Sequence, residues 1–229
     1  SKITGKAVKE YSAPKGVHPQ PDLTKIIERL GIIAYYYTGD CGSAPNRTFI
    51  NGVMVSSTVI AFPILPFGKS ASLHEMKAAG IPESEVEAWL LHFVDYIVDN
   101  HTIRLFYSHP YDMYDYPRAL KKFVDYAHKR QLDQVLQVRS MSYFATFIQR
   151  FIRTSCRFER ASGVITATIS NPEGIADITL AIPRSRFIRP IHNGGEIRED
   201  KQYYYVTMIS TNSSKQLTAA SLQLVEGGS

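Results

Sequence analysis

The stretch that decides the fold is residues 7–38, AVKEYSAPKGVHPQPDLTKIIERLGIIAYYYT. Its first residues predict a strand that ends at Pro14, and the β-branched and aromatic residues of 32–38 predict a second strand. Between the two strands, Asp22 is expected to cap a helix and Gly31 to end it. The apolar face of this helix is expected to contain Leu23, Ile26, Ile27 and Leu30. Two strands joined through a helix by short connections indicate a parallel pair that the helix covers.

The alternation of strands and helices continues to about residue 139. Asn51 and Gly52, flanked by apolar residues, predict a hairpin turn. The later elements are expected to be a strand (58–64), a helix (82–100), a strand (103–109) and a helix (117–130). We therefore expect a mainly parallel sheet covered by helices, in which loops at the carboxyl ends of the strands build the active site.

After residue 139 the pattern changes. Residues 141–154 predict one more helix, and the remaining sequence alternates apolar and polar residues as antiparallel strands do. The expected strands are 163–170, 176–183, 201–210 and 215–225, with turns at 171–174 and 193–195. Several short strands of this kind indicate a small all-β sandwich of immunoglobulin-like type. The predicted domains are therefore an α/β domain at 1–153 and a β-sandwich at 154–229.

The composition is that of a soluble globular protein, with 44% hydrophobic and 21% charged residues in 229. The net charge of +5 comes from arginines interspersed with acidic residues, which favours a mixed-charge surface over a nucleic-acid-binding one. No apolar run approaches the length of a membrane span, and no signal peptide is visible at the beginning of the sequence. The two cysteines, Cys41 and Cys156, fit no metal-binding spacing.

The candidate site residues follow the predicted strands. In IRLFYSHPYDMYDYP (103–117), His109 stands where a strand gives way to a loop. Asp40 and the loop at 12–16 also follow strands, so the three are expected to share one site. The alternatives are a histidine bonded to a backbone carbonyl and a turn aspartate. Asp112 and Asp115 could orient His109, act as ligands or simply cap the loop.

Three short motifs give these residues a resemblance to a known family. Residues 10–32 contain a segment similar to F-R-x-P-x-G followed by a helix, YYYTGD (35–40) is a strand ending in aspartate, and IRLFYSHP (103–110) is similar to a hydrophobic-x-Leu-x-His strand. In this order, residues 8–139 resemble the C-terminal half of the polysaccharide deacetylase domain of carbohydrate esterase family four. That resemblance implies part of a distorted (β/α) barrel, to which a β-sandwich can be appended.

The resemblance also implies a function, the metal-dependent deacetylation of N-acetylated amino sugars in a polysaccharide. In that family an Asp and two His hold a divalent metal, usually zinc, a neighbouring Asp is the base, and the late His is the general acid. His109 matches the acid, and Asp40 matches a carboxylate that orients it. Leu105 and Tyr107 would line the acetyl pocket, while Tyr11, Pro14 and Gly16 fit the substrate-binding loop.

The sequence departs from the family at several points. Ser12 replaces an arginine, Tyr107 replaces a leucine, and the early motifs T-F-D-D and H-S/T-x-x-H are absent. We therefore expect the divalent metal only together with an N-terminal half of the domain as partner, and we assign no metal ligand within the chain. The alternative is a non-catalytic carbohydrate-binding or cell-surface interaction protein on this scaffold. The resemblance implies a secreted, periplasmic or cell-surface location, and the particular polysaccharide is not indicated.

Overall fold

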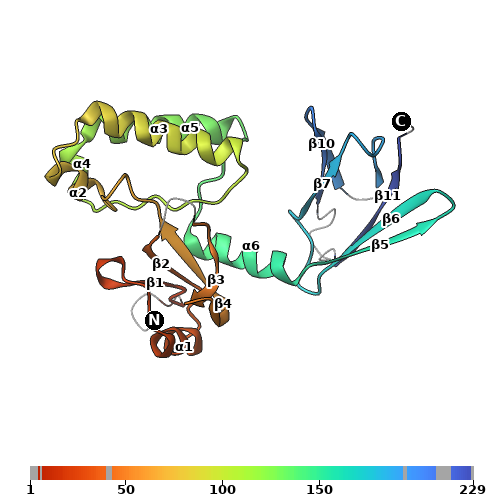
Figure 1. Ribbon diagram of the computed structural model, residues 1–229, viewed down its shortest axis with the longest axis horizontal. Coiled ribbons are helices and arrows are strands. Elements are labelled where there is room, and N and C mark those ends of the chain that lie inside the picture. Colours follow the sequence, from red (N-terminus) through yellow and green to blue (C-terminus); the bar gives the residue numbers. More distant parts are fainter. Residues whose placement is uncertain (1–4, 6, 40–42, 193–194, 210–217, 228–229) are drawn as a thin grey trace. The chain divides into compact units, whose positions relative to one another are not determined.

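The computed structural model describes Gly5 and residues 7–39, 43–192, 195–209 and 218–227. The chain divides into two compact units, Ser1–Thr146 and Phe147–Ser229, and the division falls within helix α6 (Met141–Arg153). Figure 1 labels the elements of both units. Together they form a mixed α/β protein. Among the described residues no sheet closes into a barrel, and no helix is long and apolar enough to cross a membrane.

The first unit is built on a four-stranded sheet with the order β1-β2-β4-β3. Its strands are β1 (Glu10–Ser12), β2 (Ala34–Thr38), β3 (Asn46–Ile50) and β4 (Val53–Ile64). β1, β2 and β4 are mutually parallel, as predicted, and β3 pairs with β4 in the antiparallel sense. Asn51 and Gly52 join β3 to β4 with φ angles of 51° and 78°, which is the left-handed geometry that a two-residue hairpin turn requires.

Helix α1 (Pro21–Arg29) packs against β4. It begins at Pro21, with Gln20 at the N-cap, so the prediction that Asp22 caps it was wrong. Proline is favoured at a first helical position because its φ angle is already helical, and Asp22 instead lies in the first turn, where a carboxylate suits the helix dipole. Ile27 is buried, whereas Leu30 is 70% exposed, so the apolar face is narrower than expected.

The strand expected at 103–109 is reduced to a single bridge between Leu105 and Ile64. Ile64 is the last residue of β4 and already pairs with Thr38 on its other side. The chain continues beyond β4 through Pro66, which has no N–H to offer to a longer ladder. Leu105 therefore still lies beside the carboxyl end of β4, but residues 106–109 run as a loop.

The other helices of the first unit pack mainly against one another. They are α2 (Leu73–Ala78), α3 (Glu83–Asp99), α4 (Asp112–Asp115) and α5 (Pro117–Leu132). The two long helices, α3 and α5, lie side by side (Figure 1). α3 and α5 share a hydrophobic core with α2 and with Tyr116, the residue before α5. The buried members of this core are Leu73, Met76, Val86, Leu90, Tyr116, Ala119 and Leu120. The short helices α2 and α4 were not predicted.

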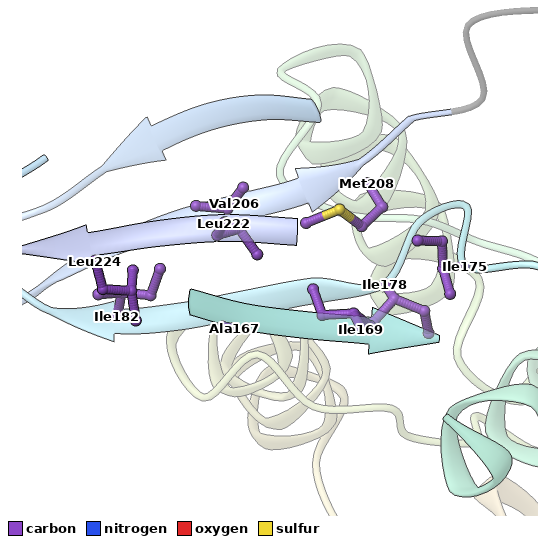
Figure 2. Close-up of a cluster of buried hydrophobic side chains, with 9 residues drawn as sticks. All are labelled: Ala167, Ile169, Ile175, Ile178, Ile182, Val206, Met208, Leu222 and Leu224. Atoms are coloured by element: carbon purple, nitrogen blue, oxygen red, sulfur yellow. The ribbon is translucent and has the colours of Figure 1, made fainter. Parts of the chain in front are cut away.

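The second unit consists of two antiparallel sheets. One has the order β5-β6-β11-β8 and the other β7-β10-β9. The strands are β5 (Ser155–Ala161), β6 (Val164–Ser170), β7 (Thr179–Pro183), β8 (Ile191–His192), β9 (Gly195–Glu199), β10 (Tyr203–Met208) and β11 (Ala219–Val225). Buried side chains of both sheets form one cluster, shown in Figure 2. This is a sandwich-like arrangement. The expected turn residues at 193–194 and strand residues at 210 and 215–217 lie outside the described part.

Candidate functional site

The candidate site lies where the parallel strands of the first unit end. Because β1, β2 and β4 run in the same direction, their carboxyl ends share one edge of the sheet. The bridge from Leu105 to Ile64 directs the following loop to this same edge. The Tyr36 and Tyr107 rings, 5.1 Å apart, connect this loop to β2, and the Tyr36 hydroxyl in turn lies 2.5 Å from Ser12 Oγ of β1.

His109 is held on three sides. Its Nε2 atom lies 2.8 Å from the hydroxyl of Tyr107, and its Nδ1 atom lies 3.4 Å from Oδ2 of Asp112. The ring of Tyr111 stacks on the imidazole at 4.8 Å between centroids and 10° between planes. The His109 side chain is 33% exposed, so it remains accessible from solvent while its orientation is fixed.

Asp112 is the buried group of the site, with no exposed surface. Its Oδ2 atom accepts a hydrogen bond of 2.8 Å from the backbone N–H of His109 and one of 3.3 Å from the Ser108 hydroxyl. Its Oδ1 atom is buried without a hydrogen-bond partner among the described residues, and so is Nδ1 of His109. A buried carboxylate oxygen without a partner is costly, because it has lost its hydration and received no replacement.

The hydroxyl of Tyr107 completes a row of polar groups. Burial, a hydrogen bond with Tyr36 and the nearby charge of Asp112 raise the pKa of Tyr107 to about 12. Its hydroxyl is therefore protonated at neutral pH. The carboxylate beside Nδ1 of His109 favours the tautomer with the proton on that nitrogen, so that Nε2 accepts from the Tyr107 hydroxyl. A carboxylate, an imidazole and a phenol thus follow one another, as in catalytic sites that move a proton.

A group of three side chains that can ligate metals adjoins these residues. One ligand atom from each of His74, Asp112 and Asp115 lies within 4.8 Å of the others. His74 belongs to α2, and the two aspartates belong to α4, which contacts α2. The Tyr111 ring, stacked on His109, also meets the His74 ring edge-on at 5.5 Å. An imidazole and two carboxylates form a ligand set that zinc takes in proteins.

The structure brings together some of the residues predicted for the site. Leu105, Tyr107 and His109 follow one another in the loop, and a cavity of about 10 Å³ beside Leu105 and Tyr107 has room for a water-sized group at most. Tyr11 packs against the core formed by α1 and the sheet, away from this row. Asp40 lies outside the described residues.

Pro14 and Gly16 form the short turn η1 (Pro14–Gly16) directly after β1. Gly16 has a φ angle of 63°, and a Cβ atom added to it would lie 2.7 Å from Oγ1 of Thr38, so a side chain there would collide with the end of β2. His18 lies elsewhere, because its Nε2 atom is 3.0 Å from the hydroxyl of the buried Tyr35. The turn therefore borders the site, and His18 belongs to the core beside α1.

Sequence reasoning missed Tyr36, Tyr111 and His74. For His74 a signal was present, because Ser72 and Glu75 form the S-x-x-E capping box that begins α2, and both of its hydrogen bonds are made. Tyr36 and Tyr111 carried no comparable signal among fourteen tyrosines. A larger cavity of about 610 Å³, lined mainly by apolar residues of α3, α5 and the segment 103–106, does not include His109.

No protein-family model, curated protein or solved structure matches the chain. The fold and the site therefore define a mixed α/β protein with an aspartate–histidine–tyrosine row at the carboxyl edge of parallel strands.

Proposed function

We propose that this chain supplies the general acid for the metal-dependent deacetylation of N-acetylated amino sugars in a polysaccharide. The observation that carries the proposal is His109, held between a buried carboxylate and a phenol beside the ends of parallel strands. The proposal includes the fold that the resemblance implies, part of a distorted (β/α) barrel followed by an immunoglobulin-like sandwich. It also includes an N-terminal half of the domain as partner and a secreted, periplasmic or cell-surface location.

The chain's own residues would act as follows. Asp112 keeps the imidazole in one orientation, since its Oδ2 atom lies 3.4 Å from Nδ1 and accepts the backbone N–H of His109. The protonated Nε2 then donates to the amine that leaves when the amide bond breaks. In the resting chain the Tyr107 hydroxyl occupies this position, 2.8 Å from Nε2. We assign the orienting role to Asp112, and a second carboxylate contributed by Asp40 remains a prediction.

Residues of this chain also fit a divalent metal, although the resemblance assigns the metal of the reaction to the N-terminal half. Asp112 is a buried carboxylate with an unpartnered oxygen, and His74 and Asp115 lie beside it. A bound zinc ion polarises a carbonyl group and activates water. The chain's part is to hold the acid close to that position and to exclude water from the buried side of the site.

The exposed aromatic residues around His109 suit a sugar substrate. Tyr111 is 50% and Tyr114 is 89% exposed, and both follow His109 within five residues. Flat aromatic faces pack well against the C–H faces of sugar rings. Leu105 and Tyr107 remain the proposed acetyl contacts, with Pro14 and Gly16 on the substrate-binding loop, whereas Tyr11 packs in the core formed by α1 and the sheet.

The test measures acetate release from an N-acetylated chito-oligosaccharide, with the chain alone and with the protein encoded by its full reading frame. In the active form, His109→Ala is expected to lower kcat by about 10²–10⁴. The control is His128→Ala, an exposed histidine on α5. A loss below about threefold in His109→Ala, or no acetate release from the full-frame protein, would contradict the proposal.

The second candidate function is carbohydrate binding without catalysis. The exposed pair Tyr111 and Tyr114 favours it equally, and so does Ser12, which stands where the deacetylases have arginine. This function predicts that the oligosaccharide binds and that Tyr114→Ala weakens binding, while no acetate is released. Acetate release that depends on His109 excludes it.

A further inference from the structure

Packing sets the backbone positions of His74, Asp112 and Asp115. Leu73 and Met76 of α2 are each 1% exposed, and both join the core that contains Tyr116. The Tyr116 hydroxyl donates a 2.9 Å hydrogen bond to the Ile81 carbonyl, which fixes the residue after α4 to the segment after α2. The backbone positions of the three ligands are therefore set by buried neighbours.

The capping of α2 adds to this placement. Ser72 accepts from the Glu75 backbone N–H, and the Glu75 carboxylate accepts from the N–H groups of Ser72 and Ala71. The helix consequently begins at a defined residue, and His74 lies in its first turn facing α4. Asp112 and Asp115 stand three positions apart in α4, a spacing that puts both on one side of a helical turn.

A second and independent observation points to a cation. Asp112 is fully buried, Oδ2 is occupied by two hydrogen bonds, and Oδ1 has no hydrogen-bond partner among the described residues. A loop-capping aspartate needs only the contacts that Oδ2 already makes. The remaining oxygen is an anionic ligand without a counterpart, and a bound cation would supply one.

We propose that His74, Asp112 and Asp115 bind one divalent transition-metal ion, and that Oδ1 is the ligand atom of Asp112. Zinc fits best, because an imidazole with two carboxylates suits it, whereas magnesium prefers oxygen ligands alone. Zinc ligands at about 2.0–2.2 Å lie about 3.4 Å apart, so the present atoms, within 4.8 Å of one another, need only side-chain rotation to close. His74 is exposed and Asp115 half-buried, which leaves them free to rotate and leaves the ion open to solvent.

This site deepens the proposed function, because the same Asp112 carboxylate that orients His109 would bind the ion. Three protein ligands and an open position are the arrangement of catalytic zinc sites, as opposed to closed structural ones. The inference places a metal within this chain, where the deacetylase resemblance assigns it to an earlier segment. Ion binding does not depend on the reaction, so the two can fail separately.

The experiment titrates Zn²⁺ into the untagged, chelator-treated chain by calorimetry. Cys41 and Cys156 are replaced by serine so that no thiol competes for zinc. The chain is expected to bind one Zn²⁺, and His74→Gln and Asp115→Asn are each expected to weaken binding by at least about tenfold. Asp125→Asn and His128→Gln, exposed residues of α5, serve as matched controls and are expected to change the affinity by less than about threefold.

A thermal scan followed by Trp89 fluorescence gives a second readout, since Zn²⁺ that binds the folded unit raises its unfolding midpoint. His74 and Asp115 are preferred to Asp112 as test positions because neither is fully buried, so their variants are expected to fold. Absence of Zn²⁺ binding, or an affinity that His74→Gln and Asp115→Asn leave unchanged, would overturn the site. Mg²⁺ bound as tightly as Zn²⁺ would overturn its assignment to a transition metal.

Both measurements are made without substrate. Zn²⁺ binding at these residues, together with no acetate release from the full-frame protein, would overturn the proposed function and leave the metal site standing. Acetate release from the full-frame protein, together with Zn²⁺ binding that is absent or left unchanged by His74→Gln and Asp115→Asn, would overturn the metal site and leave the proposed function standing.

Discussion

Nδ1 of His109 lies 3.4 Å from Oδ2 of Asp112, and the same oxygen accepts the backbone N–H of His109 at 2.8 Å. One buried carboxylate therefore fixes both the backbone and the imidazole of the residue on which the proposed chemistry depends. The aspartate stands three positions after the histidine, at the first residue of α4, so the short helix and the loop before it form one structural unit. This explains how a loop residue can keep a defined orientation without a strand.

Removing the Asp112 carboxylate is expected to destabilise the first unit. Asp112→Ala leaves the His109 N–H without its acceptor, while the Ser108 hydroxyl can still donate to the His109 carbonyl at 3.2 Å, and a buried group left unpaired costs about 1–3 kcal/mol. Urea unfolding followed by Trp89 fluorescence measures this, because Trp89 is the single tryptophan and belongs to the first unit. The control is Asp125→Ala, whose side chain is 60% exposed. Equal unfolding midpoints for the two variants would show that Oδ2 contributes little to stability.

The stability of the first unit should fall in alkaline solution because of two tyrosines. Burial first, and then a hydrogen bond with Tyr36, raise the pKa of Tyr107 from 10.0 to about 12, and burial raises the pKa of Tyr35 to about 12. The folded state thus keeps protons that the unfolded state loses above pH 10, so the free energy of unfolding decreases as the pH rises toward 12. Below pH 10 this contribution is fully present.

Tyr107→Phe and Tyr35→Phe are each expected to make the decrease between pH 10 and 12 shallower. The measurement is the free energy of unfolding from urea titrations at a series of pH values, read from Trp89. Tyr114→Phe, at a position 89% exposed, reports the background change for a tyrosine in water. A slope that neither buried-site variant alters would contradict the assignment to these hydroxyls.

The sequence correctly predicted the helices and strands that are determined by a local pattern of residues. The period of the apolar residues predicted α3 and α5, the Asn51-Gly52 pair predicted the β3–β4 hairpin, and the alternation after residue 160 predicted β6 and β11. Each of these patterns involves residues close together in the sequence, so it can be recognised without knowledge of the tertiary structure.

The strand expected at 103–109 shows that a local pattern does not predict strand pairing. Its residues have the alternation of a strand, but a strand also needs a partner, and β4 ends at Ile64, where it offers Leu105 a single bridge. The candidate site has the same limitation. His109 could be proposed from its position, whereas His74 and Tyr36 come from distant elements. The packing of α2 and β2 brings them against Tyr111 and Tyr107, the rings beside His109.

Glu83 is expected to link stability to acidic pH through the start of α5. Burial raises its pKa, but hydrogen bonds from the Ala119 and Arg118 backbone N–H groups and from the Arg118 guanidinium outweigh burial and lower the pKa below 4.5. A lowered pKa gives stability that is present above 4.5 and is lost as the pH falls through the folded-state value.

Glu83→Gln should therefore lower the Trp89-reported unfolding midpoint at pH 7 and have a smaller effect in acid, where Glu83 itself becomes protonated. The measurement compares the unfolding midpoints of Glu83→Gln and the unaltered protein at pH 7 and at an acidic pH below 4.5. Glu85→Gln, in the first turn of the same helix, serves as control for the loss of a carboxylate near the helix N-terminus. Equal effects of Glu83→Gln at both pH values would show that the capping bonds do not depend on its charge.

The core of the second unit should be sensitive to the loss of a single side chain. Leu222 of β11 is 0% exposed and belongs to the cluster that joins the two sheets (Figure 2). Leu222→Ala removes buried methyl groups and leaves a cavity, which costs about 2–5 kcal/mol. The neighbouring Ser221 points to the other side of the strand and is exposed, so Ser221→Ala is the matched control and is expected to change stability by less than about 0.5 kcal/mol. Urea unfolding followed by far-ultraviolet circular dichroism measures both, and Trp89 fluorescence reports the first unit in the same samples. If the two variants unfold at the same urea concentration, the cluster in Figure 2 is not the stabilising core of this unit.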